Sequence, residues 1–458
     1  MSRSLRSRSV ATLTAAALAA TAHAAPAVPP AEAPALHEIA RAPSAARIEG
    51  DVRTLAGFGT RNTLSETRSD TRGIGAARRW IAAEFERISD ACGGCLEVTL
   101  QRTVVPGDPT TRIREDTEVV NVIAILRGRT EPDRYVLMSG DIDSRASDAT
   151  DPLTDAPGAN DNASGMAGAL EAARVLTAGG PRAASIVFAG LSGEEQGLYG
   201  GAHLAAKARA EGWDVTAVLN NDMIGNIAGI DGVVDNTSFR VFSQAIPVPG
   251  HRPEGWNYRR YGGEVDGPSR QLARYVERIT DRYFVNLDAL LVYRLDRFGR
   301  GGHHTPFNDE GFPAIRIMET HEHYHRQHQD LRVEDGVAYG DVVEFVDFDH
   351  AARLTAVNAA VLHALASAPP APRNVRIGGA VRASTTLAWD AVAHPELAGY
   401  RVYWRDTTAP QWSHSRWVGD VTRFTLENLV IDNFVYGVAA VGRDGHESVV
   451  AFPTAVLR

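Results

Sequence analysis

The residues of this chain that could do chemistry are carboxylates placed where apolar runs end. They stand in four turns, which carry Asp141 and Asp143, Asp161, Glu194 and Glu195, and Asp222. Three of these turns directly follow short apolar runs that predict buried strands. Ligands of open α/β sheets bind beyond the carboxyl ends of the strands, so we expect the four turns to converge at one edge of a sheet.

Carboxylates crowded at one edge predict a metal centre. They repel one another unless cations bind among them. Oxygen ligands joined by one or two imidazoles suit divalent metals. Any one of these residues, taken alone, would be better explained as a surface carboxylate in a loop. The set as a whole favours bound metal.

Three motifs make this hypothesis specific. They are Gly158–Gly165 (GANDNASG), Gly193–Gly200 (GEEQGLYG) and Asn221–Gly225 (NDMIG). In order and spacing they resemble the motifs of the two-zinc aminopeptidases of peptidase family M28, and the resemblance covers about residues 47–366. It implies two Zn²⁺ per chain and hydrolysis of N-terminal residues from peptides with a free N-terminus.

The resemblance also implies a set of metal ligands: Asp141, Asp161, Glu195, Asp222 and His328. Asp161 would bridge the two ions, Asp222 would complete the first site, and Glu195 and His328 would bind the second ion. Two ions close together acidify a shared water and polarise the scissile carbonyl.

Two further acids have roles implied by the same resemblance. Glu194 would stay off the metals as the general base, taking a proton from the bridging water and passing it to the leaving amine. Asp143 would orient its neighbour in the site, as metal ligands generally require.

The chain departs from the family pattern at two positions. Asp141 stands where the family normally has His, so four carboxylates face two divalent ions and the charges sum to zero. We therefore expect weaker acidification of the water and tolerance for harder ions such as Mn²⁺. His303 stands where the family often has Asp, and the sequence assigns it no role.

The segment His321–His325 formally matches HExxH, the helical zinc-protease motif. That motif needs a helix that places both histidines on one face. Here it directly follows the predicted strand Ala314–Met318 and shows no apolar periodicity. We interpret it as a histidine-rich turn rather than a metal site.

The fold class follows from alternating apolar runs and helical periodicity. Strands are predicted at 119–126, 135–138, 186–189, 217–219 and 314–318, and helices at 74–88, 163–176, 204–210, 269–283 and 351–366. This alternation predicts a three-layer α/β/α sandwich with a mostly parallel central sheet. Long connections such as 225–268 are expected to form the walls of the site.

The ends of the chain predict further segments. Residues 1–24 have the basic, apolar and small-residue regions of a signal peptide, and the Ala- and Pro-rich residues 25–46 predict a flexible leader. After the catalytic domain (47–366) and a linker (367–373), residues 374–458 predict a small all-β sandwich. This last segment resembles a fibronectin type III module, and its partner cannot be inferred.

Export and charge narrow the function classes. Export would take the chain to the periplasm or outside the cell, where we expect Cys92 and Cys95 to form a structural disulfide rather than a redox pair or half of a zinc knuckle. The net charge of −9 disfavours nucleic acid binding. The sequence predicts no membrane span.

Two other functions remain open. The same fold supports glutaminyl cyclases, which use one zinc, although the full ligand set favours two metals and hydrolysis. The chain could also be a catalytically weak, metal-stabilised binding protein that displays its β-sandwich. Retention of Glu194 disfavours that alternative, because a binding protein needs no unliganded base beside the metals.

Overall fold

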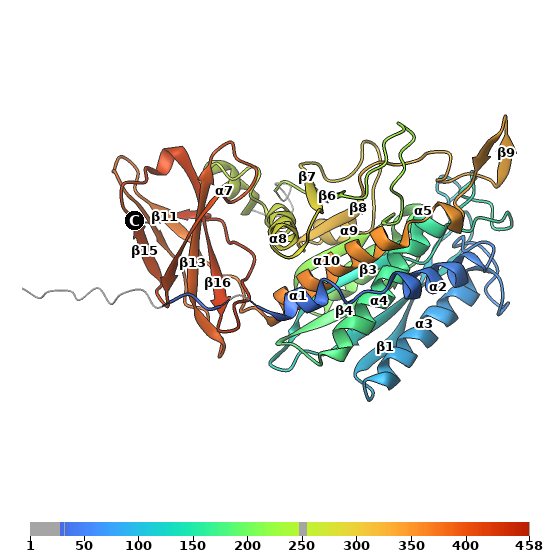
Figure 1. Ribbon diagram of the computed structural model, residues 1–458, viewed down its shortest axis with the longest axis horizontal. Helices are drawn as coiled ribbons and strands as arrows, with labels where there is room; N and C mark the ends of the chain where they lie inside the picture. Colours follow the sequence, from blue (N-terminus) through green and yellow to red (C-terminus); the bar gives the residue numbers. More distant parts are fainter. Residues whose placement is uncertain (1–27, 32, 247–253, 458) are drawn as a thin grey trace, which may run out of the picture.

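An eight-stranded sheet forms the centre of the chain, whose computed structural model describes residues 28–31, 33–246 and 254–457 (Figure 1). The order of its strands is β1-β2-β4-β3-β5-β8-β6-β7. Their bounds are Leu96–Val105 (β1), Thr117–Leu126 (β2), Glu131–Asp141 (β3), Ala184–Leu191 (β4), Asp214–Asn221 (β5), Ser238–Ser243 (β6), Asp288–Val292 (β7) and Ala314–Glu319 (β8).

The four central strands of this sheet, β4, β3, β5 and β8, run parallel to one another. β1 and β2 add an antiparallel pair at one edge, and β6 and β7 extend the other edge. The central strands are buried over almost their whole length, as their continuous apolar runs predict. Their carboxyl ends therefore share one edge of the sheet.

Helices cover both faces of the sheet and complete the predicted three-layer sandwich. One face carries α2 (Ala45–Ala56), α3 (Gly73–Ala91), α4 (Gly165–Ala178), α8 (Pro268–Tyr283) and α10 (Phe348–Ser367), and the other carries α6 (Tyr199–Ala210) and α9 (His304–Asp309). Helices α4 and α10 are rich in alanine, which lets them pack closely together and against the sheet. The side chain of Asp347 caps α10 by accepting from the backbone N–H of His350 at 2.8 Å.

The C-terminal part is an all-β sandwich, as predicted. Its two sheets have the orders β15-β12-β11-β17 and β14-β13-β16. The strand bounds are Arg376–Gly378 (β11), Thr385–Ala388 (β12), Leu397–Asp406 (β13), His414–Gly419 (β14), Arg423–Leu426 (β15), Phe434–Gly442 (β16) and Ala455–Val456 (β17). Trp389, Tyr400 and Tyr436 fill the space between the sheets. The likeness to a fibronectin type III module stays a prediction.

A buried ionic contact is among those that join the sandwich to the α/β part. Asp266, just before α8, accepts two hydrogen bonds from Arg405 on β13, at 2.9 and 2.8 Å, and one from Arg274 on α8 at 2.9 Å. Figure 1 shows the sandwich beside α8, away from the sheet edge that bears the site.

The N-terminal segment differs from the expectation. The predicted signal peptide lies outside the described residues, but part of the predicted flexible leader is ordered as helix α1 (Ala35–Ile39). Leu36 and Ile39 are three residues apart and are buried in the core beside α10. The Ala- and Pro-rich composition of the segment predicted a flexible leader, although this apolar pair has helical spacing. The predicted disulfide Cys92–Cys95 is confirmed. Over the described part of the chain, no helix combines the length and hydropathy of a bilayer span.

Candidate metal centre

The four acid-bearing turns meet at the carboxyl edge of the parallel strands. Asp141 ends β3, Asp222 follows β5, and Glu194 and Glu195 begin the short helix α5 (Glu194–Gly197) after β4. Asp161 lies in the turn η1 (Ala159–Ser164) that leads into α4. A Cβ on Gly165 would come within 2.4 Å of the carbonyl oxygen of Asn221, so glycine is needed where α4 starts beside the end of β5.

Three of the sequence-predicted ligands form a compact donor set. Single ligand atoms of Asp161, Glu195 and His328 lie within 4.8 Å of one another. The Nε2 atom of His328 is 2.9 Å from Oδ2 of Asp161 and 3.0 Å from Oε1 of Glu195. Two carboxylates and one imidazole are a common set of protein ligands for zinc.

The charges of this set are strongly coupled. Burial alone would lower the pKa of His328, but Glu195 and Asp161 raise it to about 10. Burial alone would raise the pKa of Asp161, but the charge and hydrogen bond of His328 hold it well below its ordinary value. In the metal-free protein a proton on His328 therefore takes the place of a cation.

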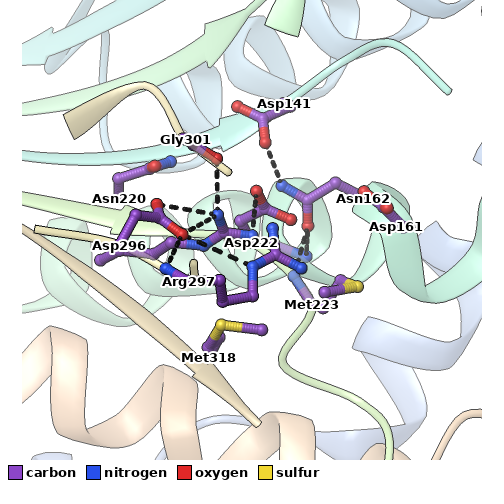
Figure 2. A network of polar contacts seen from close by, with 12 residues as sticks. Asp141, Asp161, Asn162, Asn220, Asp222, Met223, Asp296, Arg297, Gly301 and Met318 are labelled. Atoms are coloured by element: carbon purple, nitrogen blue, oxygen red, sulfur yellow. Dashed lines mark hydrogen bonds and ion pairs between the residues drawn. The ribbon is translucent and has the colours of Figure 1, made fainter. Parts of the chain in front are cut away.

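The predicted ligand Asp222 faces an arginine that no sequence motif marks. Its Oδ2 atom is 2.6 Å from a terminal nitrogen of Arg316, a fully buried residue on β8. Arg316 also bonds both oxygens of Asp296, at 3.1 and 3.0 Å, and the carbonyl of Gly301 at 2.7 Å. Figure 2 shows Asp296 and Asp222 around this network. The Oδ1 atom of Asp222 is buried and has no hydrogen-bond partner among the described residues.

The predicted ligand Asp141 is also held by its neighbours. Its Oδ1 atom lies 2.5 Å from Nδ1 of His303, and its Oδ2 atom accepts from the side-chain amide of Asn162 at 2.6 Å (Figure 2). Burial raises the pKa of Asp141 to about 8 and lowers that of His303 to about 4. Burial therefore favours the uncharged form of both side chains. The sequence assigned His303 no role. In the structure it contacts Asp141, so the two residues that depart from the family pattern are partners.

The predicted general base lies beside the donor set. Burial, followed by the charges of Glu195 and Asp222, raises the pKa of Glu194 well above its ordinary value. Asp143 fixes the start of α5, because its carboxylate accepts from the backbone N–H groups of Glu194 at 3.3 Å and Glu195 at 3.0 Å. This contact fits the positioning role predicted for Asp143.

Two residues that the sequence did not single out position Asp161. Asp341 accepts from the backbone N–H of Asp161 at 2.7 Å and from that of Asn160 at 2.9 and 3.0 Å. Asn162 accepts from the N–H groups of Gly165 at 3.1 Å and Met223 at 3.2 Å, which ties this turn to the turn after β5. Asn162 stood within a quoted motif, whereas Asp341 lies in a connection with no motif.

The HExxH-like segment is not helical. Residues 320–330 have no regular structure, and Glu322 is bound by Arg240 at 2.7 Å and Arg297 at 2.8 Å. His321 pairs with Asp231 at 2.8 Å. These contacts agree with the interpretation of this segment as a turn.

A cavity of about 830 Å³ opens over the donor set. Its floor includes Asp161, Glu194, Glu195, Asp222 and His328. Its walls come from residues 110–114, between β1 and β2, and from 297–301, before α9. Among the described residues, the long connection 225–268 contributes no wall, and part of it forms β6 instead.

The donors fit one divalent ion at Asp161, Glu195 and His328 directly. A second ion would use Asp161 and the unpartnered Oδ1 of Asp222. There Arg316 already supplies a positive charge, and both oxygens of Asp141 are engaged. The two positions therefore differ in how readily they would accept a cation.

Comparison with known proteins gives one family. Residues 121–245 match the model described as Peptidase family M28. A "Probable zinc metalloprotease" of Leptosphaeria maculans is 43% identical over 411 residues, covering 90% of this chain and 94% of the relative. Another from Pyricularia oryzae is 44% identical over 418 residues, covering 89% and 82%.

Solved structures agree on the fold. The LapA aminopeptidase of Legionella pneumophila aligns with a TM-score of 0.50 and 18% identity, covering 73% of this chain and 75% of that one. LapB of the same organism gives 0.50 and 17% over the same shares. At these identities the likeness concerns the fold alone.

Proposed function

The chain belongs to peptidase family M28, and on that premise we propose that it is a zinc-dependent aminopeptidase that removes N-terminal residues from peptides. One observation carries the proposal: Asp161, Glu195 and His328 form a candidate ligand set on the floor of a cavity, and the carboxylate of Glu194, which is not part of that set, lines the same cavity. A binding site would need the ligands but not the adjacent base.

Each residue has a defined task in the proposed reaction. A bound divalent ion would acidify the attacking water and polarise the scissile carbonyl. Glu194 takes a proton from that water and delivers it to the leaving amine. Asp143 fixes the backbone of Glu194 and Glu195, so base and ligand keep their relative positions.

We propose two ions per chain. Asp161 and Asp222, with Asp141, would hold the first ion, and Asp161, Glu195 and His328 would hold the second. The unpartnered Oδ1 of Asp222 supports the position at Asp222, while Arg316 is the charge with which an ion there would compete. The harder ion Mn²⁺ is expected to substitute for zinc, since four of the five ligands are carboxylates.

The test is one experiment on purified, metal-reconstituted protein. Its metal content is measured together with activity on aminoacyl-arylamides and on the same compounds acetylated at the N-terminus. We expect two ions per chain, cleavage of the free substrates and no cleavage of the acetylated ones. A measured content of one ion per chain at saturating metal would contradict the proposal of two ions. Equal cleavage of acetylated substrates would exclude the aminopeptidase assignment.

Export is a separate part of the proposal. We infer that the chain acts outside the cytoplasm, because residues 1–24 have the pattern of a signal peptide and Cys92–Cys95 forms a disulfide. Sequencing the N-terminus of the mature protein tests this inference, with Ala25 as the expected first residue.

A further inference from the structure

The walls of the metal cavity carry many positive charges, although the chain as a whole has a net charge of −9. Arginine is the only cationic residue other than His328 among the described residues that line it. These arginines are Arg112, Arg114, Arg145, Arg297 and Arg300.

Two of the five arginines, Arg297 and Arg145, are held by contacts within the protein. Arg297 pairs with Glu322 at 2.8 Å and Asp296 at 3.5 Å. Arg145 donates to the carbonyls of Ala146 at 3.0 Å and Ser147 at 2.6 Å, and lies 4.0 Å from a carboxylate oxygen of Glu195. Both side chains are largely buried and serve to hold the walls.

The other three arginines, Arg112, Arg114 and Arg300, form what we call the arginine rim. All three are exposed, and none makes an ion pair with any described residue. Arg112 donates one hydrogen bond to the backbone carbonyl of Glu195, which directs it towards the donor set. The rim thus presents guanidinium groups that are not held in ion pairs with acids of the described chain.

The basic surface extends beyond the metal cavity. A neighbouring cavity of about 470 Å³ shares Arg297 and Arg300 with it and adds Arg294. A peptide longer than one residue could therefore stay in contact with guanidinium groups as it leaves the metal centre. Arginine binds carboxylates through two parallel N–H donors, and this preference is stronger inside a cavity than on an open surface.

We propose that the arginine rim selects peptide substrates that carry a carboxylate close to the scissile bond. This inference rests on the proposed function and names its substrate class. The carboxylate has two sources: the side chain of an N-terminal Glu or Asp, or the C-terminus of a dipeptide. Both place a negative charge within a few ångströms of the bond to be cleaved.

The experiment compares substrates that differ in a single charge. For the side chain, the pair is glutamyl- and glutaminyl-arylamide. For the C-terminus, the pair is Leu-Leu and Leu-Leu-amide. We expect kcat/KM to favour the charged member of at least one pair by about tenfold at low salt, which corresponds to one or two exposed ion pairs. This preference should decrease as salt is added.

The variant Arg114→Gln/Arg300→Gln removes two rim charges and leaves the contact of Arg112 with Glu195 intact. The preference should fall to about twofold or less, mainly through KM, while kcat on the neutral substrate is retained. Arg416→Gln, at an exposed position on β14 in the sandwich, removes a charge away from the site and should leave the preference unchanged.

A binding measurement separates this inference from the proposed function. In a Glu194→Gln background, calorimetry should show tighter binding of Glu-Ala than of Gln-Ala, and the rim variant should abolish the difference. Equal kcat/KM within both pairs, with neutral substrates still cleaved, would overturn the rim inference alone. If no substrate is cleaved at all but the binding difference persists, the proposed function is wrong and the inference about the arginine rim is supported.

Discussion

At the scale of single residues, two glutamates distinguish two hypotheses for the general base. Glu194 lies beside the donor set, whereas Glu322, in the HExxH-like segment, is held by Arg240 and Arg297. We predict that Glu194→Gln lowers kcat by about 10²- to 10⁴-fold with its metal content unchanged, because the variant removes a proton acceptor but no ligand. Glu322→Gln should keep kcat within a few-fold of the wild type. The reverse pattern in the same assay would place the base in the histidine-rich turn.

The residues also show how far sequence reasoning reaches. The resemblance to the family implied Asp161, Glu195 and His328 as ligands, and these three residues converge in the structure. No motif marks Arg316, although a charge inside the predicted strand 314–318 was a usable signal, since buried charges need partners. The interpretation of Asp141 as a ligand could not foresee that His303 would hold it.

At the scale of elements, the turn η1 depends on a carboxylate from a distant connection. Asp341 accepts from the backbone N–H groups of Asn160 and Asp161 and so fixes the orientation of the Asp161 side chain. We predict that Asp341→Asn lowers metal affinity by about 10- to 100-fold, because the amide must turn its one acceptor oxygen to two donors. Isothermal titration of the metal-free variant measures this. Asp349→Asn, at an exposed position on α10, is the control and should match the wild type.

Helices and strands were predictable from the sequence where they are covered on both sides or pack along one apolar face. The central parallel strands and α3, α4, α8 and α10 followed from apolar runs and helical periodicity, because both faces of the sheet are covered. The edge strands β1 and β7, and β6 beside β7, were missed. Many residues of β1 and β7 are exposed, and β6 is a short strand, so the pairing of all three is decided by neighbours that lie far away in the sequence.

At the scale of the whole molecule, the buried acids make stability depend on pH. Burial raises the pKa of Asp143 to about 6 and that of Asp341 to about 7. Between pH 4 and 6.5 the buried histidines His303 and His304, whose pKa burial lowers to about 4, act in the opposite direction to these acids. Above pH 6.5 the folded state still binds a proton at Asp341 that the unfolded state has lost, so stability falls as pH rises. We predict that the Tm of the metal-free protein decreases from pH 6.5 to 8 and that bound metal reduces this decrease. A Tm that rises across this range without metal would contradict the prediction.

A fully buried ionic contact at Asp266 is among the contacts that join the two parts of the molecule, and we expect it to make them unfold together. Asp266 is fully buried and receives hydrogen bonds from Arg405 of the sandwich and from Arg274 and Gln271 of α8. Asp266→Ala leaves two buried guanidinium groups without their carboxylate, a change that costs about 3–5 kcal/mol. The loss falls on the contact between the parts rather than on either core. We therefore predict two separate transitions in calorimetry where the wild type shows one, with the sandwich unfolding first because its core is smaller.

The control variant Arg376→Gln, which removes an exposed charge within the sandwich, should leave a single transition. Two transitions already present in the wild type would mean that the contact does not couple the parts.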